Sequence, residues 1–232
     1  MPGAAEEYVT LMASLPALGP LLAARRPPIN RVRLETRLRM LKPAHREELA
    51  RLGALLSWRE LPLATTDAAL VARARALIPS LSSQTLRDVA RDRMELRTVV
   101  AALRRRHAGE EAPRDLAGWG YGRHLRTIRA NWREPDFGLA RAFTWLREGQ
   151  EKLASGDSAG FERLILGAVW TDLSRHALRH HFDYEAVALY ALRWRLVERW
   201  TAYDSARAAR RFRAMTEAAL AAAPDPFAEQ PA

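Results

Sequence analysis

Apolar residues follow a helical period along most of the chain. The clearest case starts near Ser82 or Ser83 and ends at about His107, where leucine and valine recur at three- and four-residue spacing. No segment shows sustained strand alternation bounded by hairpin turns. The sequence therefore predicts an all-α protein, a multi-helix bundle. The one candidate strand is the short run Tyr8–Leu15, which fits either a strand or a first helical turn.

The segment Phe182–Asp204 has two apolar faces when it is wound as a helix. One face carries Val187, Tyr190, Trp194 and Val197, and the nearly opposite face carries Leu189, Leu192, Leu196, Trp200 and Tyr203. A surface helix has a single apolar stripe, so two faces indicate a helix between other helices. We predict a central helix over residues 184–203, capped by Asp183, whose aromatic side chains belong to the core.

Capping residues and prolines set the other predicted boundaries. We expect helices from the cap Asn30 to Leu41, from Pro43 to about Trp58, from Thr65 to Ile78 before Pro79, from Arg123 to Trp132, from the cap Asp136 to about Ala154, from Ser158 to about Arg179, and from beyond Asp204 to Ala222. The stretch 109–122 contains several glycines and a proline, which indicates a hinge. The predicted organisation is a basic N-terminal subdomain (1–108), this hinge, a C-terminal subdomain (123–222) around helix 184–203, and a disordered tail (223–232).

The charge is unevenly distributed. The net charge is +10, and residues 1–150 hold 26 Lys and Arg against 16 Asp and Glu, whereas residues 151–232 hold 11 of each. Only Lys42 and Lys152 are lysines. A GC-rich genome favours arginine and alanine in the same way, so the surplus is weak evidence for nucleic-acid binding. The chain has no cysteine, which excludes disulfides and thiol catalysis. No segment has the apolar length of a membrane helix, so we expect membrane association only through a partner.

Few residues suggest chemistry. His176 and His180 lie one helical turn apart, as zinc ligands often do, but a third ligand is missing and histidines are common near helix C-termini. Glu185 stands in the first turn of the central helix, where a carboxylate complements the helix dipole. No second titratable group accompanies it at a predictable spacing. We therefore expect no catalytic residue, no cofactor and no metal, with His176 and His180 as weak metal candidates.

Three blocks of the sequence resemble a known bacterial family. They are RANWREPDFGLARAFTWL (Arg129–Leu146), HHFDYEAVALYALRWRLVERWTAYD (His180–Asp204) and YVTLMASLPALG with RPPIN (Tyr8–Asn30). The resemblance is to an uncharacterised family that is encoded beside V/A-type ATPase genes and is similar to the C-type subunit of these ATPases, which is called d in eukaryotes. Its signature falls here on Asn131, Trp132, Pro135, Asp136, Phe137, Trp145, Phe182, Glu185, Trp194, Trp200, Tyr203 and Asp204. Thr144 departs from the pattern, which has proline there.

The resemblance implies a non-catalytic structural component of a bacterial V-type ATPase/ATP synthase that couples the central stalk to the proteolipid ring. It implies a cytoplasmic protein held peripherally at the inner face of the membrane by its partners, without a small-molecule substrate. The C-type subunits are longer and have three helical modules, more than 232 residues accommodate at that size. Candidate partner-binding residues are Arg33, Arg37, Arg104, Arg105, Arg106, Arg126 and Arg129.

The alternative function is nucleic-acid binding by an Arg-rich helical protein. It would use the helix Asn30–Leu41 and the region from Trp119 to Arg133, where Trp119, Tyr121 and Trp132 alternate with arginines.

Overall fold

The computed structural model describes residues 7–57 and 65–222, and every regular element in these ranges is a helix. This confirms the all-α prediction. The helices are α1 (Val9–Ser14), the short 3₁₀ helix η2 (Leu21–Ala23), α2 (Arg31–Leu38), α3 (Pro43–Leu56), α4 (Asp67–Ser80), α5 (Gln84–His107), α6 (Leu116–Trp119), α7 (Leu125–Ala130), α8 (Leu146–Ala154), α9 (Ser158–Ala177) and α10 (Tyr184–Ala222). Trp58 and the predicted tail 223–232 lie outside the described residues.

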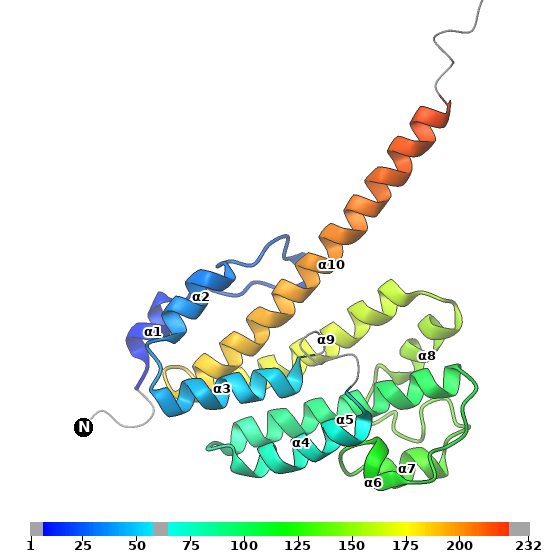
Figure 1. The fold of residues 1–232 in the computed structure, drawn as a ribbon, viewed down its shortest axis with the longest axis horizontal. Coiled ribbons are helices and arrows are strands. Elements are labelled where there is room, and N and C mark those ends of the chain that lie inside the picture. The colour runs from blue at the N-terminus through cyan, green and yellow to red at the C-terminus, as the bar shows by residue number, and fades with distance from the viewer. Residues whose placement is uncertain (1–6, 58–64, 223–232) are drawn as a thin grey trace, which may run out of the picture.

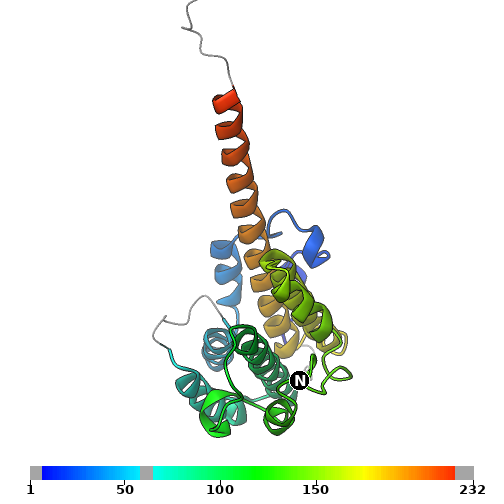
Figure 2. The ribbon, with the colours of Figure 1, turned by 90° about the vertical axis from the view of Figure 1, so that its right-hand side faces the viewer.

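The helices are arranged around α10 and its neighbour α9. α9 packs along α10, while α1, η2 and α3 contact other parts of α10 (Figure 1). α5 connects this group to the rest of the body because it contacts α3, α4, α8 and α9. The small helices α6 and α7 lie at the side of the body remote from α10, as Figure 2 also shows. The other helices therefore pack around two long helices, α10 and α5.

The first half of α10 is buried on both predicted faces. Val187 and Trp194 on one face and Leu189 and Leu196 on the other are 6% exposed or less. Asp183 caps the helix, since its carboxylate accepts a hydrogen bond from the Ala186 amide at 2.8 Å. The prediction of a sandwiched, capped central helix is confirmed.

Polar groups on α10 fasten the N-terminal segment to the helix. Trp194 donates its indole N–H to the Ile29 carbonyl at 2.8 Å, and Tyr190 donates its hydroxyl to the Pro16 carbonyl at 2.8 Å. Burial raises the pKa of Tyr190 to about 12. The run Tyr8–Leu15, for which strand and helix were both open, forms α1 at this surface. The irregular segment after α1 is therefore held by the aromatic side chains of a helix far away in sequence.

Several predicted boundaries were wrong, among them that of the helix predicted to reach Leu41, which ends at Leu38. The chain does not break after Asp204, because α10 continues to Ala222 and extends beyond the helices that pack on it (Figure 1). Pro79 does not stop the preceding helix, and α4 includes it in the last turn. A proline so near the C-terminus removes only one of the last N–H donors of the helix. The helix predicted from Arg123 to Trp132 is shorter, Leu125–Ala130.

The helix predicted from Asp136 is also wrong, because residues 136–145 form turns and α8 begins at Leu146. Phe137 and Gly138 have positive φ angles of 52° and 70°, which no α-helix accommodates. The Asp136 carboxylate accepts from the Gly138 amide at 2.9 Å and so closes this turn. Asp136 thus caps a tight turn and not a helix. An aspartate side chain can hydrogen-bond to nearby backbone amides in either structure.

The buried core is continuous across residues 109–122. Trp119 in that stretch belongs to the same hydrophobic cluster as Leu103 before it and Ile128 after it. Gly122, at φ 105°, lies against Glu95, and a Cβ atom there would come 2.2 Å from that side chain. The stretch is packed on α5, and the division into two subdomains stays a prediction.

We expect Trp194→Ala to lower the free energy of unfolding by about 3–5 kcal/mol. The substitution removes a side chain that is 2% exposed and leaves the Ile29 carbonyl without its indole donor. Urea unfolding measures the change. Val32→Ala, at a position 72% exposed, is the control and should stay within about 0.5 kcal/mol of the parent. A Trp194→Ala protein as stable as the parent would contradict the central role of α10.

Candidate functional site in a charged interhelical cleft

A cleft of about 1290 Å³ lies among α3, α5, α9, α10 and the turn segment before α8. Its wall includes apolar side chains such as Val89, Leu196 and Phe143, and charged ones from several of the flanking helices. The charged lining residues on α5, α9 and α10 are Asp92, Arg93, Glu95, Arg163, Asp172, Arg175, Arg195, Glu198 and Arg199. A cleft with so many opposed charges is the principal candidate site in the described part of the chain.

Arg93 is half-buried among these charges, and its Nη1 atom is not accessible to solvent. Burial, together with the nearby Arg199 and Arg97, lowers the pKa of Arg93 to about 9, against the opposing effect of Glu162 and Asp172. Arg199 forms a double contact with Glu162, from Nε at 2.7 Å and from Nη2 at 2.5 Å. Two cationic and two anionic side chains therefore act on Arg93, and burial is the main cause of its lowered pKa.

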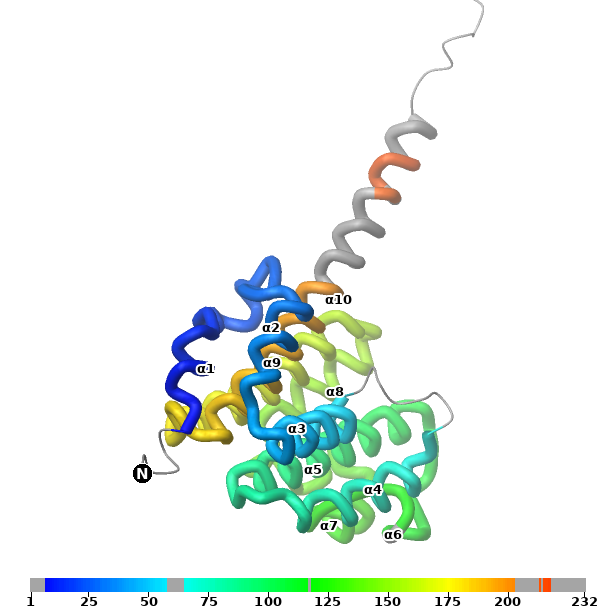
Figure 3. Tube along the Cα trace, turned by 60° about the vertical axis from the view of Figure 1, so that its left-hand side comes forward, coloured from blue at the N-terminus to red at the C-terminus, as the bar shows by residue number. Residues whose placement is uncertain are grey.

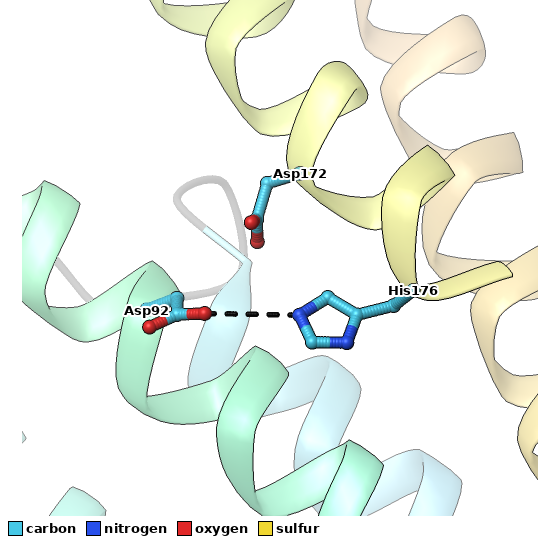
Figure 4. Close-up of side chains that lie close together, drawn as sticks. All are labelled: Asp92, Asp172 and His176. Carbon is cyan, nitrogen blue, oxygen red and sulfur yellow. Dashed lines mark ion pairs between the residues drawn. The ribbon is translucent and has the colours of Figure 1, made fainter. Parts of the chain in front are cut away.

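At one part of the cleft, side chains from α5 and α9 converge. Figure 4 shows Asp92 of α5 facing Asp172 and His176 of α9. Nε2 of His176 is 3.7 Å from Oδ2 of Asp92, and one ligand atom from each of the three residues lies within 4.8 Å of the others. We call these residues the Asp92–Asp172–His176 cluster. They are the residue types that ligate divalent metals.

Asp172 is the most perturbed carboxylate of the cluster. Burial raises its pKa above the ordinary value, and the charge of Asp92 acts in the same direction. His176 and Arg175 partly oppose the effect, and Arg175 donates to Oδ1 of Asp172 at 2.9 Å. The ionised carboxylate is therefore destabilised in the folded protein despite its arginine neighbour.

His176 and His180, the two weak metal candidates, have different partners in the structure. Nε2 of His180 lies 2.9 Å from the Thr85 hydroxyl and Nδ1 lies 2.7 Å from Oδ2 of Asp183. Glu185 lies close enough to His180 and Asp183 to form a second cluster of ligand types. Both nitrogens of His180 already make hydrogen bonds, so this residue joins the start of α5 to the cap of α10. His176 therefore does not share a cluster with His180, four residues after it. It shares one with Asp172, four residues before it.

Residues 131–137, which carry five of the signature residues, surround the side chain of Arg106. The Arg106 guanidinium donates to the carbonyl oxygens of Trp132, Glu134 and Pro135, with the Pro135 bond at 2.9 Å. It also lies over the Phe137 ring, 4.2 Å from the centroid. Burial lowers the pKa of Arg106. We call this arrangement the Arg106 clamp, and it fixes an irregular segment to the end of α5.

Other signature residues reinforce the clamp. Trp132 donates its indole N–H to the Glu110 carbonyl at 3.0 Å, and the Asn131 amide donates to the Thr127 carbonyl at 3.1 Å. Asp136 accepts from Nε of Arg147 at 3.1 Å, and this hydrogen bond lowers the pKa of Asp136. These side chains hold the segment in place from both of its ends.

The remaining signature residues are divided between core and surface. Trp194 and Trp200 are buried, Trp145 is half-buried in the cleft wall, and Phe182 is 40% exposed. The side chains of Tyr203 and Asp204 are outside the described part of the structure.

The predicted partner-binding arginines are spread over two separate regions. Arg33 and Arg37 belong to α2, whereas Arg126 and Arg129 belong to α7 on the far side of the body (Figure 3). Arg33, Arg104, Arg126 and Arg129 are exposed. Arg105 pairs with Asp67 at 2.5 Å, and Arg106 forms the clamp. The exposed four can meet a partner, although no single patch contains them all.

The aromatic residues proposed for base stacking lie in the interior. Trp119 and Trp132 are 7% and 8% exposed, and their rings meet edge to face at a centroid distance of 6.4 Å. The interpretation of these two rings as a stacking platform was wrong, because the protein covers their faces.

Comparison with known proteins identifies the family of the chain. Residues 69–220 match the DUF2764 family, described as a protein of unknown function. The chain belongs to this family. No curated protein and no solved structure matches it. The DUF2764 match begins in α4 and ends in α10, so it contains the Arg106 clamp, the Asp92–Asp172–His176 cluster and the packed half of α10.

Sequence reasoning missed two residues of the cluster in this DUF2764 region, Asp92 and Asp172. Asp172 and His176 are four residues apart on one helix, a spacing that places both side chains on the same face. The metal prediction considered this spacing only for His176 and His180. Asp92 carries no local signal, because only the packing of α5 on α9 brings it to the other two.

We can test whether the Arg106 clamp depends on the planar shape of the guanidinium or on its positive charge alone. Arg106→Lys keeps the cation but replaces the planar fork that reaches three carbonyl groups. We expect it to lower the free energy of unfolding by about 1–3 kcal/mol. Chemical denaturation measures this, with Arg104→Lys at the neighbouring exposed site as the matched control. Equal stability of the two variants would show that charge alone suffices.

The raised pKa of Asp172 makes a prediction about pH. A carboxyl group whose pKa is raised by folding favours the folded state below its unfolded pKa, and this contribution is lost as pH rises through its folded pKa. In chelator-containing buffer, Asp172→Asn should therefore remove this pH-dependent loss and be at least as stable as the parent at pH 7. Thermal unfolding across a pH series checks it, with Asp88→Asn, an exposed aspartate paired with Arg91, as control. A large loss of stability at pH 7 would contradict the argument.

Proposed function

We propose that this protein is a non-catalytic structural component of a bacterial V-type ATPase, similar to the C-type subunit, that helps to couple the central stalk to the proteolipid ring. The proposal rests on the resemblance in the three sequence blocks and on one structural observation, the long continuous helix α10. It includes peripheral attachment at the inner face of the membrane through these partners. Among the described residues, no helix has the length and hydropathy needed to cross a bilayer.

α10 has the properties of a connecting arm. It contains 39 residues, which at 1.5 Å per residue is about 58 Å of unbroken helix. Its first half is fixed between α9, α3 and the N-terminal segment, while the second half extends away from the body and carries Met215 at 62% exposure. A coupling subunit must transmit force without bending, and a helix anchored on two faces at one end suits that task.

The use of the signature residues supports the same proposal. The Arg106 clamp and the Trp194 hydrogen bond join helices to irregular segments, so both stiffen the body. The exposed Arg33, Arg126 and Arg129 leave cationic groups on two sides of the body for contact with acidic surfaces of partner subunits. These features describe a rigid connector between two partners.

We expect an affinity-tagged copy, expressed in its host and solubilised with the membrane fraction, to co-purify subunits of the V-type ATPase. A variant that ends after Thr201 lacks the extended half of α10 and should lose these partners while keeping its melting temperature, because the packed half is intact. Mass spectrometry of the eluates measures the partners, and thermal unfolding measures the stability.

The double variant Arg126→Glu, Arg129→Glu tests the second proposed contact surface, on α7, which is exposed and remote from α10 (Figure 1). Loss of partners in this variant alone would move the contact from α10 to α7. Absence of every ATPase subunit from the eluate of the full chain would reject the proposed function.

A further inference from the structure

The spacing within the Asp92–Asp172–His176 cluster differs from that of a hydrogen-bonded group. Nε2 of His176 and Oδ2 of Asp92 are 3.7 Å apart, beyond the range of about 2.7–3.2 Å for a hydrogen bond. Ligand atoms around a tetrahedral zinc ion, at bond lengths of about 2.0–2.2 Å, are about 3.4 Å from one another. The separation of up to 4.8 Å in the cluster needs only small side-chain movements to reach this value. The three atoms surround a space that suits a shared cation.

The charges at the cluster also favour a cation. Two carboxylates from different helices face the same space. Arg175 bonds to one oxygen of Asp172, and its own side chain is 71% exposed. Solvent therefore weakens this compensation, and the carboxylate of Asp172 still faces the cluster. A divalent ion would neutralise both carboxylates at once.

His176 is oriented as a ligand. Its side chain is only 11% exposed, and Figure 4 shows a ring nitrogen directed toward Asp92, which is Nε2. Nδ1 is buried, and no group in the described part of the chain forms a hydrogen bond with it. The polar contact that the ring makes among these residues is therefore toward the carboxylates, and burial of the side chain limits its rotation.

We propose that Asp92, Asp172 and His176 bind one divalent transition-metal ion of the zinc type, which bridges α5 and α9. One imidazole and two carboxylates form a mixed nitrogen and oxygen donor set of the kind that zinc accepts. Three protein ligands leave a fourth position for water. This position faces the cleft, because both aspartates belong to its wall. The site is independent of the proposed ATPase function.

Calorimetry with Zn²⁺ on the full chain, stripped of metal by a chelator and carrying no histidine tag, tests the proposal. We expect about one equivalent to bind and the melting temperature to rise with zinc concentration. Binding should weaken as pH falls, because the imidazole and carboxylates must lose their protons to act as ligands. Mg²⁺ at the same concentration should bind far more weakly, since it prefers octahedral oxygen sites.

Variants locate the site. Asp92→Asn changes a side chain that is 40% exposed, so the fold should tolerate it. Both Asp92→Asn and His176→Gln should weaken Zn²⁺ binding by about 10–100-fold. His181→Ala, an exposed histidine outside the cluster, should bind as the parent does. The proposal would be overturned if the parent bound no zinc, if Asp92→Asn left zinc binding unchanged, or if His181→Ala abolished it. Equal affinity for Mg²⁺ would overturn the assignment to a transition metal.

Discussion

The burial of α10 on two opposite faces is the constraint on which the rest of the structure depends. A helix with one apolar stripe can dock on a finished surface, but a helix with two requires a layer on each side. Here α9 and α3 contact it together with the N-terminal segment, whose carbonyl groups at Pro16 and Ile29 accept hydrogen bonds from its aromatic side chains. The segment between α1 and α2 has little regular structure of its own and depends on α10 for its position.

α5 serves as a second axis, and its polar residues hold irregular backbone. Glu95 accepts from the Arg123 amide at 3.1 Å, and Thr98 exchanges hydrogen bonds with the backbone of Tyr121. At the end of the helix, Arg106 donates hydrogen bonds to the carbonyl groups of Trp132, Glu134 and Pro135. Buried backbone groups need partners wherever helices end. In this protein the side chains of Glu95, Thr98 and Arg106 on α5 provide those partners for several backbone groups of residues 121–135.

The charged cleft has a different character from these fully bonded regions. Arg93 lies near both cationic and anionic side chains, and Asp172 is one of them, while at the Asp92–Asp172–His176 cluster two carboxylates lie close together. Burying charged groups costs stability unless a partner or ligand compensates them. The Arg106 clamp and the aromatic anchors of α10 explain how the body is made rigid. The cleft is where charged side chains from several helices of the DUF2764 chain gather, which is why it is the principal candidate site.

The sequence by itself determined the class and most of the helices. Periodicity identified α5 and the two-faced half of α10, and capping residues identified Asn30 and Asp183 correctly, because these signals are local. It failed at Asp136, where a tight turn competed with a helix cap, and beyond Asp204, where an uninterrupted helix had no local stop. Only the tertiary structure decided that Arg106 meets the signature residues and that Asp92 meets His176, because both contacts join elements remote in sequence. A period along one helix defines its faces, and the packing of two helices decides which residues on those faces meet.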